Sequence, residues 1–371
     1  MRILVDYRAA LRNRTGVGEY MHELVRAYTA AYADDIVLFS SSWKDRPAET
    51  IAGDLRARVV DVRIPVRVLN LLWHRAGWPP VELLAGTVDI AHAAHPLLVP
   101  TRRAAQVVTT HDLFFLAHPE RTRAEIRRDY PALAAAHARR ADAIITSSHH
   151  TKALIADRLG VPADHVYVCP PGPPVWQTLG RGPNIPRDGC ILFMGTLEPR
   201  KNVGVLLDAY ADLLARTPHA PRLVLAGRLT PAAEPWLARL ETPPLRGRAL
   251  SIGYVPDGQQ EPLFASARVL VLPSLDEGFG LPVLAAMSAG VPVIAARRGA
   301  LPEVVGAGGT LVDPEDPHAL ATALERLVLD DDWAAAQGRA GLERARAFSW
   351  PAAAAVLHDA YQDAVVRRRA R

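Results

Sequence analysis

Two adjacent cations, Arg200 and Lys201, stand where a predicted strand passes into a predicted helix. The strand is expected at Cys190–Met194 and leads into Gly195, and the helix begins at Val203. Arginine binds phosphate oxygens bidentately, lysine supplies a compact charge, and glycine lets a ligand approach the backbone, so the pattern suits a diphosphate. The alternative is a solvated basic pair on a loop, which is weakened because the chain holds only three lysines.

Glu277 lies in a glycine-rich segment between a strand expected to end at Leu272 and a helix with Pro282 in its first turn. At such a helix start we expect the backbone N–H groups of Gly280 and Leu281 to point outward, where they can hold a phosphate or a sugar hydroxyl. A carboxylate on the same side can accept hydrogen bonds from sugar hydroxyls or stabilise positive charge that develops on an anomeric carbon. The alternative is a glycine-rich turn with a solvated glutamate.

Two further features come from the first half of the chain. His111 directly follows a strand expected at 106–110, so its imidazole can point into a site and hydrogen-bond a sugar hydroxyl or a carbonyl; a helix-capping or packing histidine is the alternative. Gly16 and Gly18 precede a helix, where they either admit an anion or form a tight turn. Met21 stands where a dinucleotide fingerprint would have its third glycine, so that motif is incomplete.

The elements that must position these residues form two successive series of short apolar runs alternating with amphipathic segments. This alternation is typical of parallel sheets with helices on both faces. We therefore expect an α/β protein with two doubly wound, Rossmann-like domains and a ligand site in the cleft between them, at the carboxyl ends of the strands. Strands are expected at 3–5, 36–39, 59–62, 88–91, 107–110, 143–146 and 166–168, and then at 190–194, 222–226, 249–252, 269–272 and 291–295.

Proline and glycine mark the boundary between the two series. The run Pro170–Pro174 and the later pair Gly180 and Gly182 cannot continue a helix or a central strand. We expect a first domain at 1–170, a linker at 171–188 and a second domain at 189–350. A C-terminal helix at 351–371 is expected to pack back on the first domain.

The composition excludes several classes of protein. The chain has 371 residues, 49% of them hydrophobic and 22% charged, and a net charge of +4, which is typical of folded globular proteins. Two cysteines, Cys169 and Cys190, are too few for a disulfide framework and lack metal-ligand spacing. No secretory signal and no apolar stretch of about 18 residues is present, so we expect a cytoplasmic protein. Its basic residues lack the stacking aromatics of a nucleic-acid interface, and no nucleic-acid partner is expected.

A set of motifs in fixed order resembles the retaining glycosyltransferases of family 4, which have the two-domain GT-B fold. Within that family, the motifs of the chain resemble those of bacterial mannosyl- and rhamnosyl-type transferases of O-antigen or exopolysaccharide synthesis. The likeness runs nearly end to end and is carried by Thr15–Gly18, Thr110–Leu113, Gly195–Asn202, Gly253–Pro256, Pro273–Pro282, Ala300–Val304 and Leu311–Pro317.

The resemblance implies a role for each matching residue. Gly16 and Gly18 would lie near the donor phosphates, His111 would contact the donor sugar, and Arg200 and Lys201 would bind the diphosphate and stabilise the leaving nucleotide. Further donor contacts would come from Glu277 with the backbone of Phe279, Gly280 and Leu281, from Gly195, and from Tyr254 and Val255 against the base. The resemblance also implies that no metal or other cofactor is needed, because the two cations take the place of a divalent ion.

The acceptor side is less defined by the sequence. A GT-B enzyme would bind a glycan or lipid-linked acceptor on its first domain. The segment 63–78 mixes arginines, leucines and two tryptophans, so it suits either the inner face of an anionic membrane or an ordinary helix packed on the sheet.

One departure from the family pattern concerns the nucleotide ribose. The family has two glutamates eight residues apart, and the second usually binds the ribose; here Glu277 is present, but Ala285 replaces its partner. Loss of such hydrogen bonds costs on the order of 1.5–3 kcal/mol, or roughly ten- to a hundredfold in donor affinity. We expect an active hexosyltransferase with altered ribose contacts. The alternatives are a degenerate subunit that only binds nucleotide sugars and a GT-B-fold epimerase.

Overall fold

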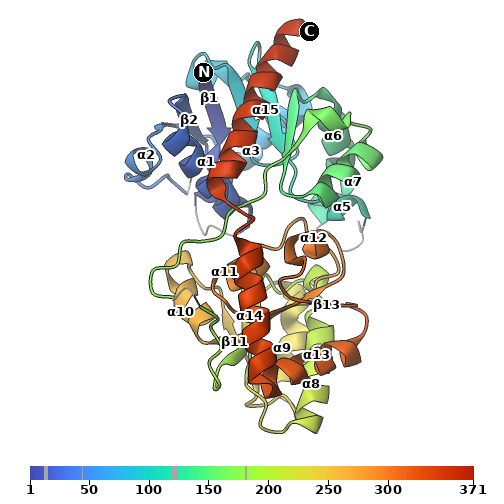
Figure 1. The fold of residues 1–371 in the computed structure, drawn as a ribbon. Coiled ribbons are helices and arrows are strands. Elements are labelled where there is room, and N and C mark those ends of the chain that lie inside the picture. The colour runs from blue at the N-terminus through green and yellow to red at the C-terminus, as the bar shows by residue number, and fades with distance from the viewer. Residues whose placement is uncertain (12–15, 44, 118–123, 180–181) are drawn as a thin grey trace. The chain divides into compact units, whose positions relative to one another are not determined.

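The computed structural model describes residues 1–11, 16–43, 45–117, 124–179 and 182–371. The chain divides into two compact units (Figure 1). Unit 1 comprises Met1–Gly172 together with Ser349–Arg371, and unit 2 comprises Pro173–Phe348. The second unit is therefore an insertion between the body of the first and its C-terminal helix.

Unit 1 is built on a seven-stranded sheet in the order β3-β2-β1-β4-β5-β6-β7, in which every neighbouring pair is parallel. Apolar runs such as Ile-Leu-Val in β1 are buried on both faces, as a parallel sheet between helical layers requires. The strands are β1 (Arg2–Asp6), β2 (Asp35–Ser40), β3 (Arg58–Asp61), β4 (Ile90–Ala93), β5 (Ala105–Thr109), β6 (Ala143–Thr146) and β7 (Val166–Val168).

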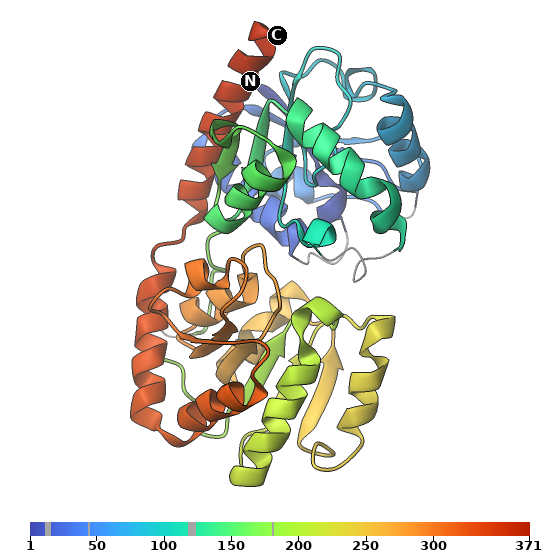
Figure 2. The ribbon, with the colours of Figure 1, turned by 90° about the vertical axis from the view of Figure 1, so that its right-hand side faces the viewer.

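Helices follow most strands of unit 1. They are α1 (Val17–Ala31), α2 (Ile51–Asp54), α3 (Val66–Leu71), α4 (Glu82–Ala85), α5 (Phe114–Ala117), α6 (Ala124–Arg140), α7 (His149–Leu159) and α15 (Trp350–Ala370), with a π-helical turn at Leu72–Ala76 and 3-10 turns at Tyr7–Ala10 and Ala163–His165. The last helix, α15, packs against α1 and across β5, β6 and β7 (Figure 2). Its buried Tyr361 hydroxyl lies 2.7 Å from Nδ1 of His92 on β4, so the C-terminal helix is bonded into the core of unit 1.

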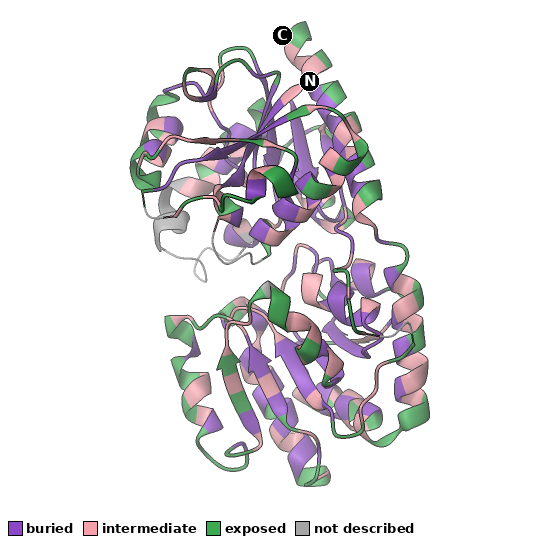
Figure 3. Ribbon diagram, turned by 90° about the vertical axis from the view of Figure 1, so that its left-hand side faces the viewer, coloured by how far each residue is buried: buried purple, intermediate pink, exposed green. Residues whose placement is uncertain are grey.

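Unit 2 has a six-stranded parallel sheet in the order β10-β9-β8-β11-β12-β13. The strands are β8 (Cys190–Met194), β9 (Leu223–Ala226), β10 (Ala249–Gly253), β11 (Ala267–Leu272), β12 (Val293–Ala296) and β13 (Thr310–Val312). The helices are α8 (Val203–Arg216), α9 (Glu234–Leu240), α10 (Gln260–Ala265), α11 (Leu281–Ser288), α12 (Leu301–Val305), α13 (Pro317–Leu329) and α14 (Asp331–Ala345), with 3-10 turns at Pro199–Lys201, Pro231–Ala233 and Asp257–Gln259. The central strands of both units are buried (Figure 3).

The two doubly wound parallel sheets confirm the predicted fold class. The segment expected to be a linker, however, is largely packed on unit 2. The indole Nε1 of Trp176 donates to Ser288 Oγ at 2.9 Å, and the backbone N–H of Asn184 donates to the Gly290 carbonyl at 2.9 Å. Its five prolines favour an extended backbone and remove five N–H groups that would otherwise need partners, which suits a segment that runs along a folded surface.

Candidate active site

The predicted site residues of unit 2 lie at the carboxyl edge of its sheet. Arg200 and Lys201 occupy the 3-10 turn Pro199–Lys201 after β8, and Glu277 lies in the loop between β11 and α11. Because β8 and β11 are neighbouring parallel strands, both loops leave the same edge. The backbone N–H of Leu275 donates to the carbonyl of Arg200 at 2.8 Å, which joins the two loops directly.

Glu277 is the centre of this group. Its side chain is 8% exposed, and both carboxylate oxygens accept hydrogen bonds. Oε1 accepts from Nζ of Lys201 and, at 2.7 Å, from Oγ of the fully buried Ser274. Oε2 accepts from Nη1 of Arg200 at 3.0 Å. A buried charge is stable only when it is paired and hydrogen-bonded, and this carboxylate meets both conditions.

The charges of the group fix its protonation. Burial raises the pKa of Glu277, but the Lys201 ammonium and the Arg200 guanidinium outweigh burial and hold that pKa at about 2. Burial lowers the pKa of Lys201, and the Glu277 carboxylate offsets part of that shift. At neutral pH Glu277 is therefore an anion, and it lies between the side chains of Lys201 and Arg200.

Arg200 has further partners that fix its orientation. Its Nη1 also donates to the Asp276 carbonyl at 2.9 Å, while Nε and Nη2 donate to Oε1 of Glu198 at 3.2 and 3.1 Å. The next residue but one, Asn202, has a φ of +57° and donates through Nδ2 to the carbonyls of Pro273 and Pro314. These two hydrogen bonds join the turn that carries Arg200 and Lys201 to the loops that follow β11 and β13.

Close backbone contacts explain several glycines of the site. A Cβ on Gly227 would lie 1.8 Å from the carbonyl oxygen of Gly195, so the loops after β8 and β9 can meet only through glycine. Gly299 has a φ of +60°, and a Cβ there would lie 2.6 Å from the backbone nitrogen of Glu277. Gly280, the N-cap of α11, has a φ of +104°. The glutamate loop is thus held against its neighbours by backbone packing.

The remaining predicted residues of unit 2 lie at the same edge, and their roles toward a donor stay predictions. Tyr254 and Val255 are half-buried just after β10. Phe279 is 6% exposed and packs edge to face on Phe348 at 5.6 Å, so its side chain supports the loop from inside. Leu281, half-buried, is the first residue of α11.

Unit 1 holds the other predicted residues. His111 follows β5, and its ring packs edge to face on Tyr20 with centroids 5.2 Å apart. Burial lowers the pKa of His111 to about 4, so the imidazole is neutral at pH 7, and its buried Nε2 has no hydrogen-bond partner among the described residues. A buried polar atom without a hydrogen bond costs folding free energy. The state of Nε2 therefore supports His111 as a residue that hydrogen-bonds a ligand.

The two glycines of unit 1 differ from each other. Gly16 is the N-cap of α1 with a φ of +41°, and a Cβ there would meet no atom within 4 Å, so its surroundings are open. Gly18 is buried, and a Cβ would lie 2.4 Å from the Ala9 carbonyl oxygen, so it lets α1 pack closely on the 3-10 turn after β1. Thr15, which begins the motif, lies outside the described residues.

Three residues of the site were not singled out from the sequence. Ser274, Glu198 and Asn202 lie within the quoted motifs, and their side chains bond the cluster or the loop that carries it. Their nearness to strand ends was the available signal, since Ser274 lies two residues after β11 and Glu198 lies four residues after β8. Which of several polar neighbours meets the carboxylate depends on loop geometry that spacing does not specify.

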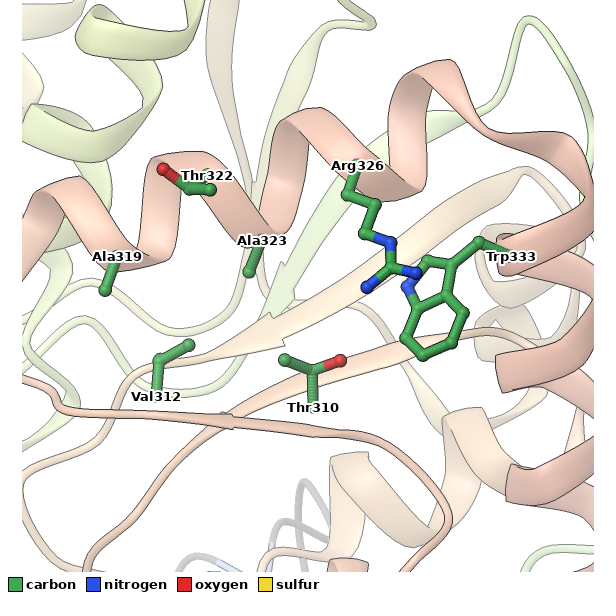
Figure 4. Close-up of a pocket in the computed structure, with 7 residues that line it drawn as sticks. All are labelled: Thr310, Val312, Ala319, Thr322, Ala323, Arg326 and Trp333. Atoms are coloured by element: carbon green, nitrogen blue, oxygen red, sulfur yellow. The ribbon is translucent and has the colours of Figure 1, made fainter.

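A pocket of about 400 Å³ lies elsewhere in unit 2, between β13 and α13 (Figure 4). The guanidinium of Arg326 covers the ring of Trp333 at 3.6 Å from its centroid. None of the predicted site residues lines this pocket. Its lining consists of Thr310, Val312, Ala319, Thr322, Ala323, Arg326 and Trp333.

Within its described part, the chain has neither a metal-binding group of side chains nor a membrane-spanning helix. There, no three His, Cys, Asp or Glu side chains are grouped so that they could hold a metal ion. Among the same residues, every helix is too short or too polar to cross a bilayer. Independence from metal stays a prediction.

Comparison with known proteins identifies the family. Residues 14–174 match the family described as Glycosyltransferase Family 4, and residues 188–330 match Glycosyl transferases group 1. The O-antigen chain mannosyltransferase B of Escherichia coli is 30% identical over 362 residues, which span 91% of this chain and 93% of that protein. The chain belongs to the family 4 glycosyltransferases.

Other relatives of this glycosyltransferase match over a shorter range or by fold. The D-inositol 3-phosphate glycosyltransferase of Corynebacterium glutamicum is 37% identical over 181 residues, 47% of this chain and 43% of that one. Sucrose-phosphate synthase from Thermosynechococcus elongatus superimposes with a TM-score of 0.74 at 22% identity, covering 97% and 98% of the two chains. For WaaG, a glycosyltransferase involved in lipopolysaccharide biosynthesis, the TM-score is 0.72 at 15% identity, over 97% and 99%. This glycosyltransferase therefore has the GT-B fold.

Proposed function

We propose that this glycosyltransferase moves a hexosyl group, most specifically a mannosyl group, from a nucleotide diphosphate sugar to a glycan or lipid-linked acceptor with retention of anomeric configuration. The observation that carries the proposal is the buried cluster of Glu277, Arg200 and Lys201 at the carboxyl edge of the unit 2 sheet. The mannosyl group is supported by the O-antigen mannosyltransferase, which is similar over nearly the whole chain.

The proposed chemistry follows from the charges of the cluster. Arg200 and Lys201 bind the diphosphate and stabilise its charge as the bond from the anomeric carbon to the phosphate oxygen breaks. The electron pair of that bond leaves with the nucleoside diphosphate. The acceptor hydroxyl oxygen bonds to the anomeric carbon on the same face, and its proton passes to the departing phosphate oxygen. Glu277 faces the sugar, where a carboxylate stabilises the positive charge of the anomeric carbon.

His111 contributes a neutral hydrogen-bonding group to the proposed site. Its low pKa keeps the ring uncharged, and its Nε2, which bonds none of the described residues, suits a sugar hydroxyl. Because two side-chain cations already face the diphosphate, we propose that no divalent metal or other cofactor is required.

The proposed location is the cytoplasmic face of a membrane. Leu69 and Trp73 pack into the core, as an ordinary helix would, but Val68, Leu71 and Trp78 are 47%, 60% and 57% exposed. The arginines of this segment, Arg63, Arg67 and Arg75, are exposed too. We name these six exposed side chains the basic apolar surface: Arg63, Arg67, Val68, Leu71, Arg75 and Trp78. Its mixture of arginine and apolar side chains suits anionic lipids that surround a lipid-linked acceptor.

A thermal-shift panel tests the donor. UDP, GDP, dTDP, ADP and their common sugar conjugates are each added to the protein, since a ligand that binds only the folded state adds about 2.7 kcal/mol of stability at roughly a hundredfold excess over its Kd. We expect one base to raise the Tm, and the matching mannose conjugate to be consumed with an acceptor. Proton NMR of the product then gives its anomeric configuration. Binding without turnover would favour a non-catalytic subunit, and conversion without acceptor would favour an epimerase.

A further inference from the structure

The carboxylate of Glu277 occupies the donors that a phosphate would use. One of its oxygens accepts from Lys201 and Ser274, and the other accepts from Arg200 at 3.0 Å. The two cations that converge on this carboxylate also form a suitable set for a phosphate group. When no nucleotide sugar is bound, these cations are paired with the Glu277 carboxylate of the protein itself.

The formal charge of the group supports the same point. Arg200 and Lys201 are opposed by Glu277 and by Glu198, which accepts from Arg200 at 3.1 and 3.2 Å. The four side chains therefore sum to zero. A diphosphate that enters must exchange partners with a buried carboxylate, because these cations carry no net charge in excess.

We propose that Glu277 is an internal counter-ion that a diphosphate must displace from Arg200 and Lys201, so that the site favours sugar-linked diphosphates over free ones. This inference rests on the proposed function. A displaced carboxylate needs new hydrogen-bond donors, and the hydroxyls of a donor sugar supply them. A free nucleoside diphosphate has no such hydroxyls near its terminal phosphate, so the same displacement leaves Glu277 without partners. Release of the nucleoside diphosphate after transfer is favoured for this reason.

Ser274 holds the counter-ion in place. It is fully buried, and its hydroxyl donates at 2.7 Å to the same oxygen that Lys201 contacts. Removing this hydroxyl leaves every charge of the cluster unchanged but weakens the position that Glu277 takes without ligand. Ser274 is thus a positioning residue that acts through Glu277.

The test is calorimetric titration of the full chain with inorganic pyrophosphate. We expect Glu277→Gln to bind at least about tenfold more tightly than wild type, because one unit of opposing charge is removed at contact distance. Ser274→Ala is expected to bind about three- to tenfold more tightly, since one hydrogen bond to the competing carboxylate is lost. Glu325→Gln is the matched control: it removes the same charge from a side chain of unit 2 that is 27% exposed and pairs with Arg216 outside the cluster, and less than about a threefold change is expected.

Each outcome decides the proposal. Thermal melting first establishes that the variants fold. If Glu277→Gln does not fold, the affinity of Ser274→Ala for pyrophosphate decides the proposal alone. The proposal is overturned if the folded variants bind pyrophosphate no more tightly than wild type, or if Glu325→Gln gains as much as Glu277→Gln. Wild type is titrated in parallel with nucleotide sugars. If it binds none of them while the variants behave as expected, the proposed function fails and the counter-ion stands.

Discussion

A lysine that is 8% exposed is unusual, and Lys201 is tolerated because its ammonium meets Glu277. The position of Lys201 on a loop would by itself suggest that its removal leaves the fold unaffected. Burial changes the expectation for stability, because Glu277 loses one of its partners when Lys201 is removed. Arg200 and Ser274 still bind the carboxylate, so the loop keeps most of its contacts.

The first prediction concerns catalysis by Lys201. Lys201→Ala should lower kcat by about 10²–10³-fold, because a preorganised charge beside the leaving diphosphate is lost. Its Tm should also fall, but the variant should remain folded. Lys152→Ala, which removes a half-buried lysine from α7 of unit 1, is the control and should keep wild-type kcat. Near-normal turnover by Lys201→Ala would remove this residue from the site.

Ala285 gives the second prediction at this scale. It lies on α11 with 7% of its surface exposed, at the position where the family has its second glutamate. Ala285→Glu should tighten donor binding by roughly ten- to a hundredfold if the ribose lies there. Ala285→Gln has the same length without the charge and should gain less. Calorimetry with the donor found in the nucleotide panel measures both, and unchanged affinity would mean that the ribose is bound by other residues.

At the scale of elements, strand positions were predictable because buried parallel strands are continuous apolar runs. The runs at 143–146, 166–168 and 190–194 coincide with β6, β7 and β8. β13 was not predicted, since its three residues follow Gly308 and Gly309 and are half-buried for the most part. A short edge strand takes its conformation from pairing with β12, and that pairing is not visible in a local pattern.

The candidate site was predictable to the same extent. Spacing from strand ends placed Arg200, Lys201 and Glu277 at one edge of a sheet, and the structure brings them into contact. The contact of Gly195 with Gly227 could not be predicted, because it requires knowing that β8 and β9 are neighbours. Local sequence therefore locates the loops, whereas the order of strands decides which loops touch.

The basic apolar surface on α3 and the turns after it carries the third prediction. Leu71→Glu should abolish most binding to vesicles of phosphatidylglycerol, because it replaces a 60% exposed apolar side chain with a charge that anionic lipid repels. Leu329→Glu at the end of α13 is the matched control, since Leu329 is 63% exposed and lies in unit 2. Vesicle sedimentation measures both variants. Equal loss, or no binding by wild type, would show that this face has another role.

At the scale of the whole molecule, the two units differ in the titratable groups that they bury. Unit 1 buries the ionised Asp6, whose pKa Arg8 holds well below its usual range against the raising effect of burial, and it also buries neutral imidazoles. Burial lowers the pKa of His92 to about 3, with nearby His111 adding to the shift, and burial lowers the pKa values of His74, His111 and His137 to about 4. Unit 2 buries the ionised Glu277, whose pKa is held at about 2 by Lys201 and Arg200 against the opposing effect of burial. These groups lose their stabilising effect in different ranges of pH.

The last prediction follows from the sign of these shifts. An unfolded histidine binds a proton near pH 6.5 while the folded one does not until about pH 3–4, so unfolding takes up protons and unit 1 loses stability as the pH falls from 6.5 toward 4. Each fully buried histidine contributes about 2 kcal/mol of this loss at pH 5. The Glu277 contribution is complete above about pH 4.5 and is lost only toward pH 2. Unit 1 should therefore open first in mild acid.

Peptide-resolved hydrogen exchange at pH 7.5 and 5.0, corrected for intrinsic rates, separates the two units. Amides of unit 1 should lose protection over this interval, by an amount equivalent to a drop of at least about 5 °C in the Tm of that unit. Amides of unit 2 should keep their protection. In His92→Gln the amide can still bond Tyr361 and Thr109, which contact the imidazole in the native protein, but it does not titrate. The variant should therefore lose less stability between the two pH values than wild type loses. An equal acid response in His92→Gln, or earlier opening of unit 2, would show that buried histidine does not set the acid limit of this fold.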